Sequence, residues 1–169
     1  ITIGKETQGT TGVSVNNGSA STVVTLGQNS VINILGAAQG ADGGQPKQNI
    51  GVQVQNSDAA QVTNNGTINV SGTNAVGENV VAESGHTAKI VNTDSSRIVV
   101  EEANTNLVTR NYGIYADGQD TGSTEATIDG SLELKGNNVI GAHARGNSTF
   151  AVDSHIFRRC KSSRFSYLW

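Results

Sequence analysis

A short motif, in which an apolar residue or Thr is followed by Gly and then by a short alternating stretch, recurs five times in the chain of 169 residues. The five copies occupy residues 11–15, 50–54, 76–80, 112–116 and 140–144, so that their glycines are 39, 26, 36 and 28 residues apart. A repeat of a few tens of residues is typical of a solenoid, in which each unit stacks only on its neighbours.

Each copy of the motif is followed by two further stretches in which apolar and polar residues alternate, the period of a half-buried strand. The second stretches are residues 20–24, 60–62, 88–90, 126–128 and 150–152, and the third are residues 31–34, 67–70, 97–100 and 131–134. A unit of three strands cannot bury its own apolar face, so stacking at about 4.8 Å must supply the core. The sequence therefore predicts an all-β solenoid of about five coils with three short strands per coil.

Stacking predicts two continuous apolar columns along the third stretches. The first column is Ile32, Ile68, Ile98 and Leu132, and the second is Ile34, Val70, Val100 and Leu134. Glu78 departs from the pattern, because the alignment of the motifs places it at an inward position. The equivalent residues in the other units are Val13, Val52, Ile114 and Ala142. Since burial of an unpaired carboxylate is costly, we expect the strand to slip, with Val81 inward and a β-bulge at Val80.

The predicted corners are rich in Asn and Gly, at residues 16–18, 64–66 and 137–138. Both residue types tolerate positive φ, which sharp corners require. Two longer polar stretches, residues 36–49 and 101–111, are predicted to be surface loops, and loops of a repeat array often carry function.

Charge is unevenly distributed along the chain. Residues 1–154 hold 7 basic and 14 acidic residues, a net charge of −7, whereas residues 155–169 hold four basic residues, a net charge of +4. An acidic body without clustered Lys and Arg argues against nucleic-acid binding. We also expect no membrane insertion by this segment, because no apolar run is long enough to span a bilayer.

The last stretch, residues 154–169 (SHIFRRCKSSRFSYLW), breaks the repeat. It holds four of the seven aromatic residues and the single Cys, and it contains no Gly or Asn. We interpret residues 1–153 as one β-helical domain and residues 154–169 as a tail that is disordered or foreign to the repeat. A capping segment, which such arrays need at an open end, is the alternative.

Two sequence motifs of the repeat carry a family resemblance: residues 64–70 (NNGTINV) and residues 111–116 (NYGIYA). Over residues 1–153 the chain resembles the passenger domains of Gram-negative autotransporters, especially the large adhesin-like ones of type V secretion. The resemblance implies a right-handed parallel β-helix that is exported through the outer membrane and displayed at the bacterial cell surface. Because the chain opens on Ile1 and contains no Met, we expect it to be a fragment of a longer protein or a processed form.

The outward row of the motif strands is the predicted contact strip. It consists of Ser14, Gln53, Asn79, Tyr115 and His143. The row is polar with one large aromatic residue, and we expect its partner to be a protein or glycan on a host-cell or bacterial surface. Uncovered strand edges at the ends of the stack also predict end-to-end self-association.

A second class of function is a carbohydrate-active enzyme, because β-helix folds also include polysaccharide lyases and hydrolases. Such enzymes need acidic residues that converge on one groove. Asp117 and Asp120 flank a Gly-rich turn, where solvated carboxylates are the ordinary case, and the alternating spacing of a calcium loop is missing. His86, His143 and His155 lack the spacing of metal ligands. We therefore expect no catalytic residue, metal or cofactor, and we favour an adhesin or structural stalk.

Overall fold

The computed structural model describes residues 1–36, 47–103 and 110–152, which form fifteen strands and no helix. The strands make three parallel sheets of five strands each, named here sheets A, B and C. Sheet A contains β1 (Thr2–Ile3), β4 (Val31–Ile34), β7 (Thr67–Gly72), β10 (Arg97–Ala103) and β13 (Ser131–Lys135). Sheet B contains β2 (Thr11–Asn16), β5 (Asn49–Gln55), β8 (Ala75–Ala82), β11 (Asn111–Gly118) and β14 (Val139–Gly146). Sheet C contains β3 (Val23–Leu26), β6 (Gln61–Asn64), β9 (Thr87–Asn92), β12 (Ser123–Ile128) and β15 (Ser148–Val152).

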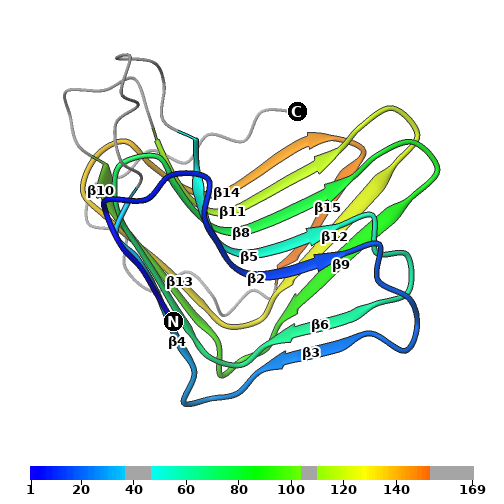
Figure 1. Ribbon diagram of the computed structural model, residues 1–169, viewed down its shortest axis with the longest axis horizontal. Coiled ribbons are helices and arrows are strands. Elements are labelled where there is room, and N and C mark those ends of the chain that lie inside the picture. The colour runs from blue at the N-terminus through cyan, green and yellow to red at the C-terminus, as the bar shows by residue number, and fades with distance from the viewer. Residues whose placement is uncertain (37–46, 104–109, 153–169) are drawn as a thin grey trace.

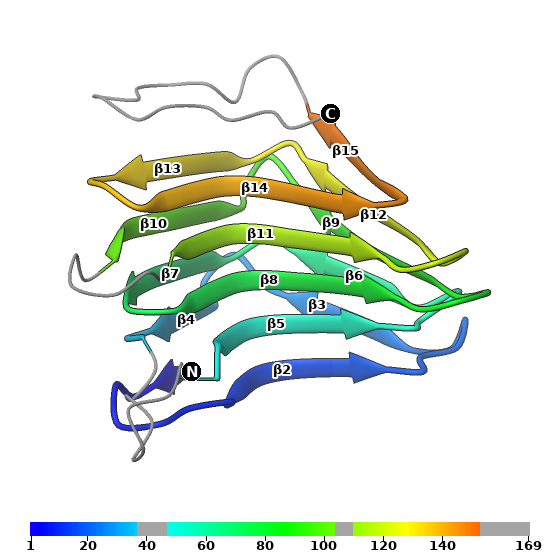
Figure 2. The ribbon, with the colours of Figure 1, turned by 90° about the horizontal axis from the view of Figure 1, so that it is seen from above.

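The chain passes through sheets A, B and C in turn and then repeats the circuit. In Figure 1 it runs clockwise from β2 through β3 to β4. Figure 2, seen from above, shows that the later coils lie behind the earlier ones in the first view. The fold is therefore a right-handed parallel β-helix of five coils with three strands per coil, as predicted.

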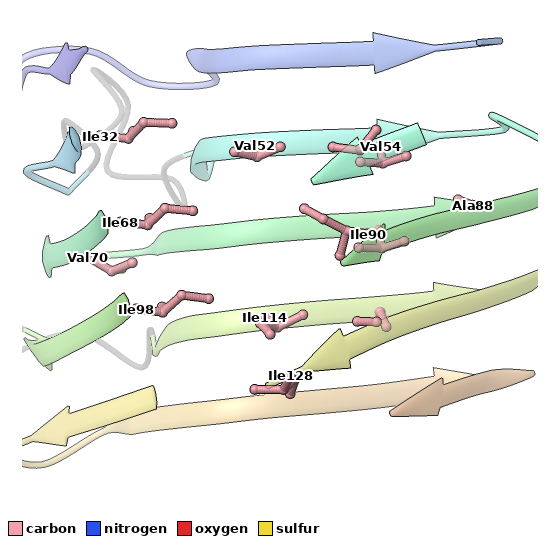
Figure 3. Close-up of a cluster of buried hydrophobic side chains, with 14 of the residues drawn as sticks. Ile32, Val52, Val54, Ile68, Val70, Ala88, Ile90, Ile98, Ile114 and Ile128 are labelled. Carbon is pink, nitrogen blue, oxygen red and sulfur yellow. The ribbon is translucent and has the colours of Figure 1, made fainter. Parts of the chain in front are cut away.

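The core consists of apolar columns that run along the helix axis. The ladders between β4, β7, β10 and β13 place the members of both predicted columns in register. Figure 3 shows Ile32, Ile68 and Ile98 one above another, and each of these side chains is at most 1% exposed. Full burial of one such side chain contributes about 1.5–3 kcal/mol, so the columns are the main source of stability.

The glycine of the repeated motif has a steric cause. A Cβ added to Gly77 would lie 2.5 Å from the carbonyl oxygen of Gly113 in the next coil and 3.1 Å from Cγ2 of Val70 in sheet A. A Cβ added to Gly113 would likewise lie 2.5 Å from the carbonyl oxygen of Gly141. Only a residue without a side chain fits between the next strand of sheet B and the core side chains of sheet A, which explains why the motif repeats its glycine.

The first coil differs from the sequence prediction in two places. The sequence predicts the second strand of the first unit at residues 20–24, but β3 covers Val23–Leu26, because the amide of Thr22 bonds to the carbonyl oxygen of Ser19 in a turn (2.8 Å). The short strand β1 (Thr2–Ile3) is absent from the prediction, since two residues are too few to show alternation.

The predicted slip at Glu78 is wrong. Glu78 pairs in register with Val52 and with Ile114, its side chain is 0% exposed, and Val80 is buried one inward position further along. No bulge is needed because two asparagines reach the carboxylate inside the helix. Nδ2 of Asn64 donates to Oε1 at 3.1 Å, and Nδ2 of Asn92 donates to Oε2 at 2.8 Å.

The corners confirm the predicted positive φ at Asn17 (52°) and Asn138 (56°), but neither Asn64 nor Asn65 adopts it. Asn64 instead turns its side chain into the core. Asn111 has a similar role between sheets A and B, where its Nδ2 donates to the carbonyl oxygens of Gly72 (3.0 Å) and Glu101 (3.1 Å). Buried amide side chains therefore satisfy the backbone at the corners.

Parts of the predicted loops, residues 37–46 and 104–109, lie outside the described residues, as does the predicted tail at residues 154–169. In the part that is described, no helix is long and apolar enough to cross a membrane.

Candidate contact surface on sheet B

The outer face of sheet B carries the predicted contact strip. The ladders pair the five residues in order along the helix axis: Ser14, Gln53, Asn79, Tyr115 and His143. Each coil contributes one residue, at the ladder spacing of about 4.8 Å. Ser14 is exposed and the other four are partly exposed, so the structure brings all five residues together in one accessible row.

Three rings form a cluster at the C-terminal end of this row, on β11 and β14. Tyr115 stacks on His143, with ring centroids 5.1 Å apart and planes 19° apart. Tyr112 packs edge-to-face against both rings, at 5.4 Å from Tyr115 and 5.8 Å from His143. These contacts hold the side chains in place before any partner arrives, which lowers the entropic cost of binding.

Arg145 extends the ring cluster along β14. Its side chain is 70% exposed, and its Nη1 lies 3.8 Å from Oδ2 of Asp117 directly across on β11. A hydrogen bond with the Tyr115 hydroxyl and the charge of Asp117 raise the pKa of Arg145. The carboxylate of Asp117 is only 8% exposed, so the guanidinium is the charge that a partner meets.

The N-terminal half of the face is uncharged along the row. Nε2 of Gln53 donates to Oε1 of Gln55 at 3.2 Å, and Nε2 of Gln55 donates to Oε1 of Glu83 at 3.3 Å. The row therefore presents hydroxyl and amide groups in its first three coils, and the ring cluster with the exposed Arg145 follows in the last two.

Asp117 and Asp120, the two carboxylates considered for a carbohydrate-active enzyme, interact with different partners. Asp117 faces Arg145 and accepts a hydrogen bond from Nε2 of Gln119 at 3.3 Å. Asp120 lies in a corner with positive φ and accepts a hydrogen bond from Oγ of Ser84 at 3.0 Å. Among residues 1–36, 47–103 and 110–152, no group of three or more His, Cys, Asp or Glu side chains is placed to hold a metal ion.

The second histidine of the described chain also lies at the surface. Nδ1 of His86 is 3.2 Å from Oδ2 of Asp58, and both side chains are about half exposed. The backbone N–H of Thr87 and the side chain of His86 lower the pKa of Asp58. His155 lies outside the described residues.

Among the residues that the structure describes, Glu78 is the one whose pKa lies far from its ordinary value. Burial raises its pKa to about 7, and the hydrogen bonds from Asn92 and Asn64 only partly oppose this. The cluster is internally satisfied, since Nδ2 of Asn64 also donates to Oδ1 of Asn92 at 2.9 Å and the amide of Gly66 donates to Oδ1 of Asn64 at 2.9 Å. Its place inside the β-helix keeps the carboxylate out of reach of a partner.

The row follows from the alignment of the repeated motifs, but the neighbours that complete the ring cluster do not. In the sequence Tyr112 is only the first residue of a motif, and Arg145 belongs to no predicted site. The predicted register does pair Asp117 with Arg145, because both lie two residues beyond the predicted strip positions Tyr115 and His143. No sequence pattern indicates that the Tyr112 ring turns toward the other two.

Comparison with known proteins does not assign the chain to a family. No family model, curated protein or solved structure matches it.

Proposed function

We propose that this chain is a segment of a bacterial adhesin or stalk displayed at the cell surface, with the outer face of sheet B as its contact surface. The observation that carries the proposal is the in-register row that ends in the packed cluster of Tyr112, Tyr115, His143 and Arg145. Tyr and Arg are the residue types that dominate binding hot spots. A rigid parallel sheet presents them without loop ordering.

Repetition along the axis supports a contact role. Each coil adds a polar residue to the same row, and weak contacts that are linked along a rod gain avidity without a single deep pocket. Such a surface suits a protein or a glycan on another cell. The segment has the right-handed parallel β-helix that an autotransporter passenger is expected to have, and the repeat lines at residues 64–70 and 111–116 point to the same class. Export through the outer membrane is part of this proposal.

The test is attachment of bacteria that display the protein to host cells and to other bacteria. Tyr115→Ala and Arg145→Ala are each expected to weaken attachment strongly, because loss of a hot spot of about 2 kcal/mol lowers affinity about 30-fold. Arg97→Ala is the matched control, since Arg97 is an exposed arginine that pairs with Glu133 at 2.6 Å on the outer face of sheet A.

Two results would contradict the proposal. Attachment that survives the double variant Tyr115→Ala/Arg145→Ala would exclude sheet B as the contact surface. Depolymerisation of pectin-like or glycosaminoglycan chains by the purified protein, lost on Asp117→Asn or Asp120→Asn, would replace the adhesin by the carbohydrate-active enzyme.

A further inference from the structure

The contact strip is flanked by two further rows on the outer face of sheet B, whose five strands Figure 2 shows side by side. The row on one flank consists of Thr11, Ile50, Val76, Tyr112 and Ile140. It leans toward the strip, since the Tyr112 ring contacts the Tyr115 and His143 rings. The row on the other flank ends in Asp117 and Arg145. A ligand on the strip therefore meets a mostly apolar flank on one side and a cation on the other.

Amide groups of the strip are available to a ligand. Asn79 lies at the centre of the strip, and no group of residues 1–36, 47–103 and 110–152 forms a hydrogen bond with its side chain. Gln53, one coil before it, donates from Nε2 to Gln55 and accepts from Oγ1 of Thr11. One N–H of the Gln53 amide therefore remains without a partner among the described residues. Both side chains are partly exposed, so they can bind the hydroxyl groups of a ligand.

The cation beside the strip is placed to receive an anion. Arg145 is the only Lys or Arg in the five strands of sheet B. The carboxylates that pair with Lys89 and Arg97 are themselves partly exposed and would repel an approaching anion. At Arg145 the guanidinium is 70% exposed, whereas the carboxylate of Asp117 is withdrawn to 8% exposure. The guanidinium can therefore bind an anion through paired N–H groups, as arginine does with carboxylates.

The spacing of the strip favours one kind of linear polymer. Successive residues of the strip lie about 4.8 Å apart along the helix axis. Side chains on one face of an extended peptide recur after two residues, about 6.6 Å, and do not match this spacing. A pyranose unit is close in length to the ladder spacing. A polysaccharide that lies parallel to the axis therefore places about one sugar over each coil.

The composition of the face also disfavours a protein partner. The centre of a protein interface is apolar and depleted of charge. None of the exposed large hydrophobic side chains of the described residues lies in a strand of sheet B. Rings beside amide and hydroxyl groups instead suit a sugar, which has both C–H faces and hydroxyl groups.

We propose that the contact strip binds an acidic polysaccharide, which lies parallel to the helix axis with about one sugar per coil and with an acidic group at Arg145. The acidic group is a carboxylate or a sulfate, because both can accept two parallel N–H bonds from a guanidinium. This inference rests on the proposed function, since it names the ligand of the same contact surface.

The first test measures binding of the purified chain to immobilised polymers. Polygalacturonate, which carries carboxylates, and dextran sulfate are compared with their neutral counterparts, methyl-esterified polygalacturonate and dextran. At least one acidic polymer is expected to bind more tightly than its neutral counterpart, and this binding should weaken as the salt concentration rises. The polymer that binds identifies the acidic group.

Variants then locate the site. Arg145→Gln should lower the affinity for the acidic polymer at least about 10-fold, because it removes hydrogen bonds to a charged group. Arg97→Gln removes the same charge from the outer face of sheet A and should leave the affinity unchanged. Asn79→Ala should weaken binding without lowering stability in urea unfolding, because its amide has no partner among the described residues.

The second test checks that the polymer lies along the axis. A dimer of the acidic sugar covers only β11 and β14, whereas a tetramer reaches Gln53 on β5, about 10 Å from Tyr115 at the ladder spacing. Gln53→Ala should therefore weaken binding of the tetramer but not of the dimer. Arg145→Gln should weaken binding of both.

Three outcomes would overturn the inference. Neither acidic polymer could bind better than its neutral counterpart; if bacterial attachment then still depends on Tyr115 and Arg145, the adhesin proposal stands with a protein partner. Equal losses from Arg145→Gln and Arg97→Gln would reduce the binding to general attraction between charges. Unchanged binding of the tetramer to Gln53→Ala would exclude a polymer that lies along the axis.

Discussion

Replacement of Glu78 by Gln tests the energetic cost of the carboxylate inside the β-helix. In the unfolded chain the pKa of this carboxyl is close to 4.5, and in the folded chain it is about 7. The folded state therefore binds the proton more tightly. The contribution of this group to the free energy of unfolding is therefore greatest below pH 4.5 and falls as the pH rises from 4.5 to about 7.

The magnitude follows from the size of the shift. Each pKa unit corresponds to about 1.36 kcal/mol, so a shift from 4.5 to about 7 makes the wild-type chain on the order of 3 kcal/mol less stable at pH 8.5 than at pH 4 through this group. The glutamine that Glu78→Gln introduces cannot ionise. Its amide nitrogen would face an Nδ2 donor of Asn64 or Asn92, and the lost hydrogen bond costs about 1–2 kcal/mol at every pH.

The assay is urea unfolding of the wild-type chain and the Glu78→Gln variant between pH 4 and 8.5. At pH 4 the variant is expected to be less stable than wild type by about 1–2 kcal/mol, and at pH 8.5 to be more stable by a similar amount. The difference between the two chains is the informative quantity, because contributions from all other titrating groups cancel in it.

The control is Glu125→Gln on the outer face of sheet C. Glu125 pairs with Lys89 at 2.7 Å, and both side chains are about half exposed. An exposed pair of this kind contributes about 0–1 kcal/mol. A difference between wild type and Glu78→Gln that is the same at pH 4 and pH 8.5 would refute the reasoning, because the carboxylate would then cost nothing to bury in its charged form.

Three further substitutions test the packing. Ile68→Asp places an unpaired charge in a column of sheet A and should unfold the chain, seen as loss of the cooperative melt in circular dichroism; a melt at the wild-type temperature would contradict the register. Gly77→Ala should destabilise strongly because its Cβ would meet the carbonyl oxygen of Gly113 at 2.5 Å, whereas Gly4→Ala meets nothing within 4 Å and should have little effect in the same urea assay. Asn111→Ala removes the donors to two backbone carbonyl oxygens and should cost about 1–3 kcal/mol, with faster amide hydrogen exchange at that corner; unchanged exchange would count against its role.

The repeat, the strands and the order of the columns follow from the sequence alone. Alternation fixes which side of a strand is buried, and the motif glycines mark equivalent points of successive coils, so Ile32 can be placed beneath Ile68 and Ile98 without a structure. The contact row is predictable for the same reason, because Tyr115 and His143 occupy the same position of neighbouring motifs.

The meeting of polar residues from different sheets, in contrast, depends on the closed coil. The sequence predicts that burial of Glu78 in sheet B is too costly, because nothing in the sequence shows which groups would bind its carboxylate. The partners are Asn64 and Asn92, each 14 residues away along the chain and at the ends of strands in sheet C. Their side chains reach the carboxylate only after the coil has closed on itself. Stacking within a sheet follows from sequence spacing, since equivalent residues of successive repeats lie above one another. Contact across the interior depends on where each corner bends, and no local pattern encodes that.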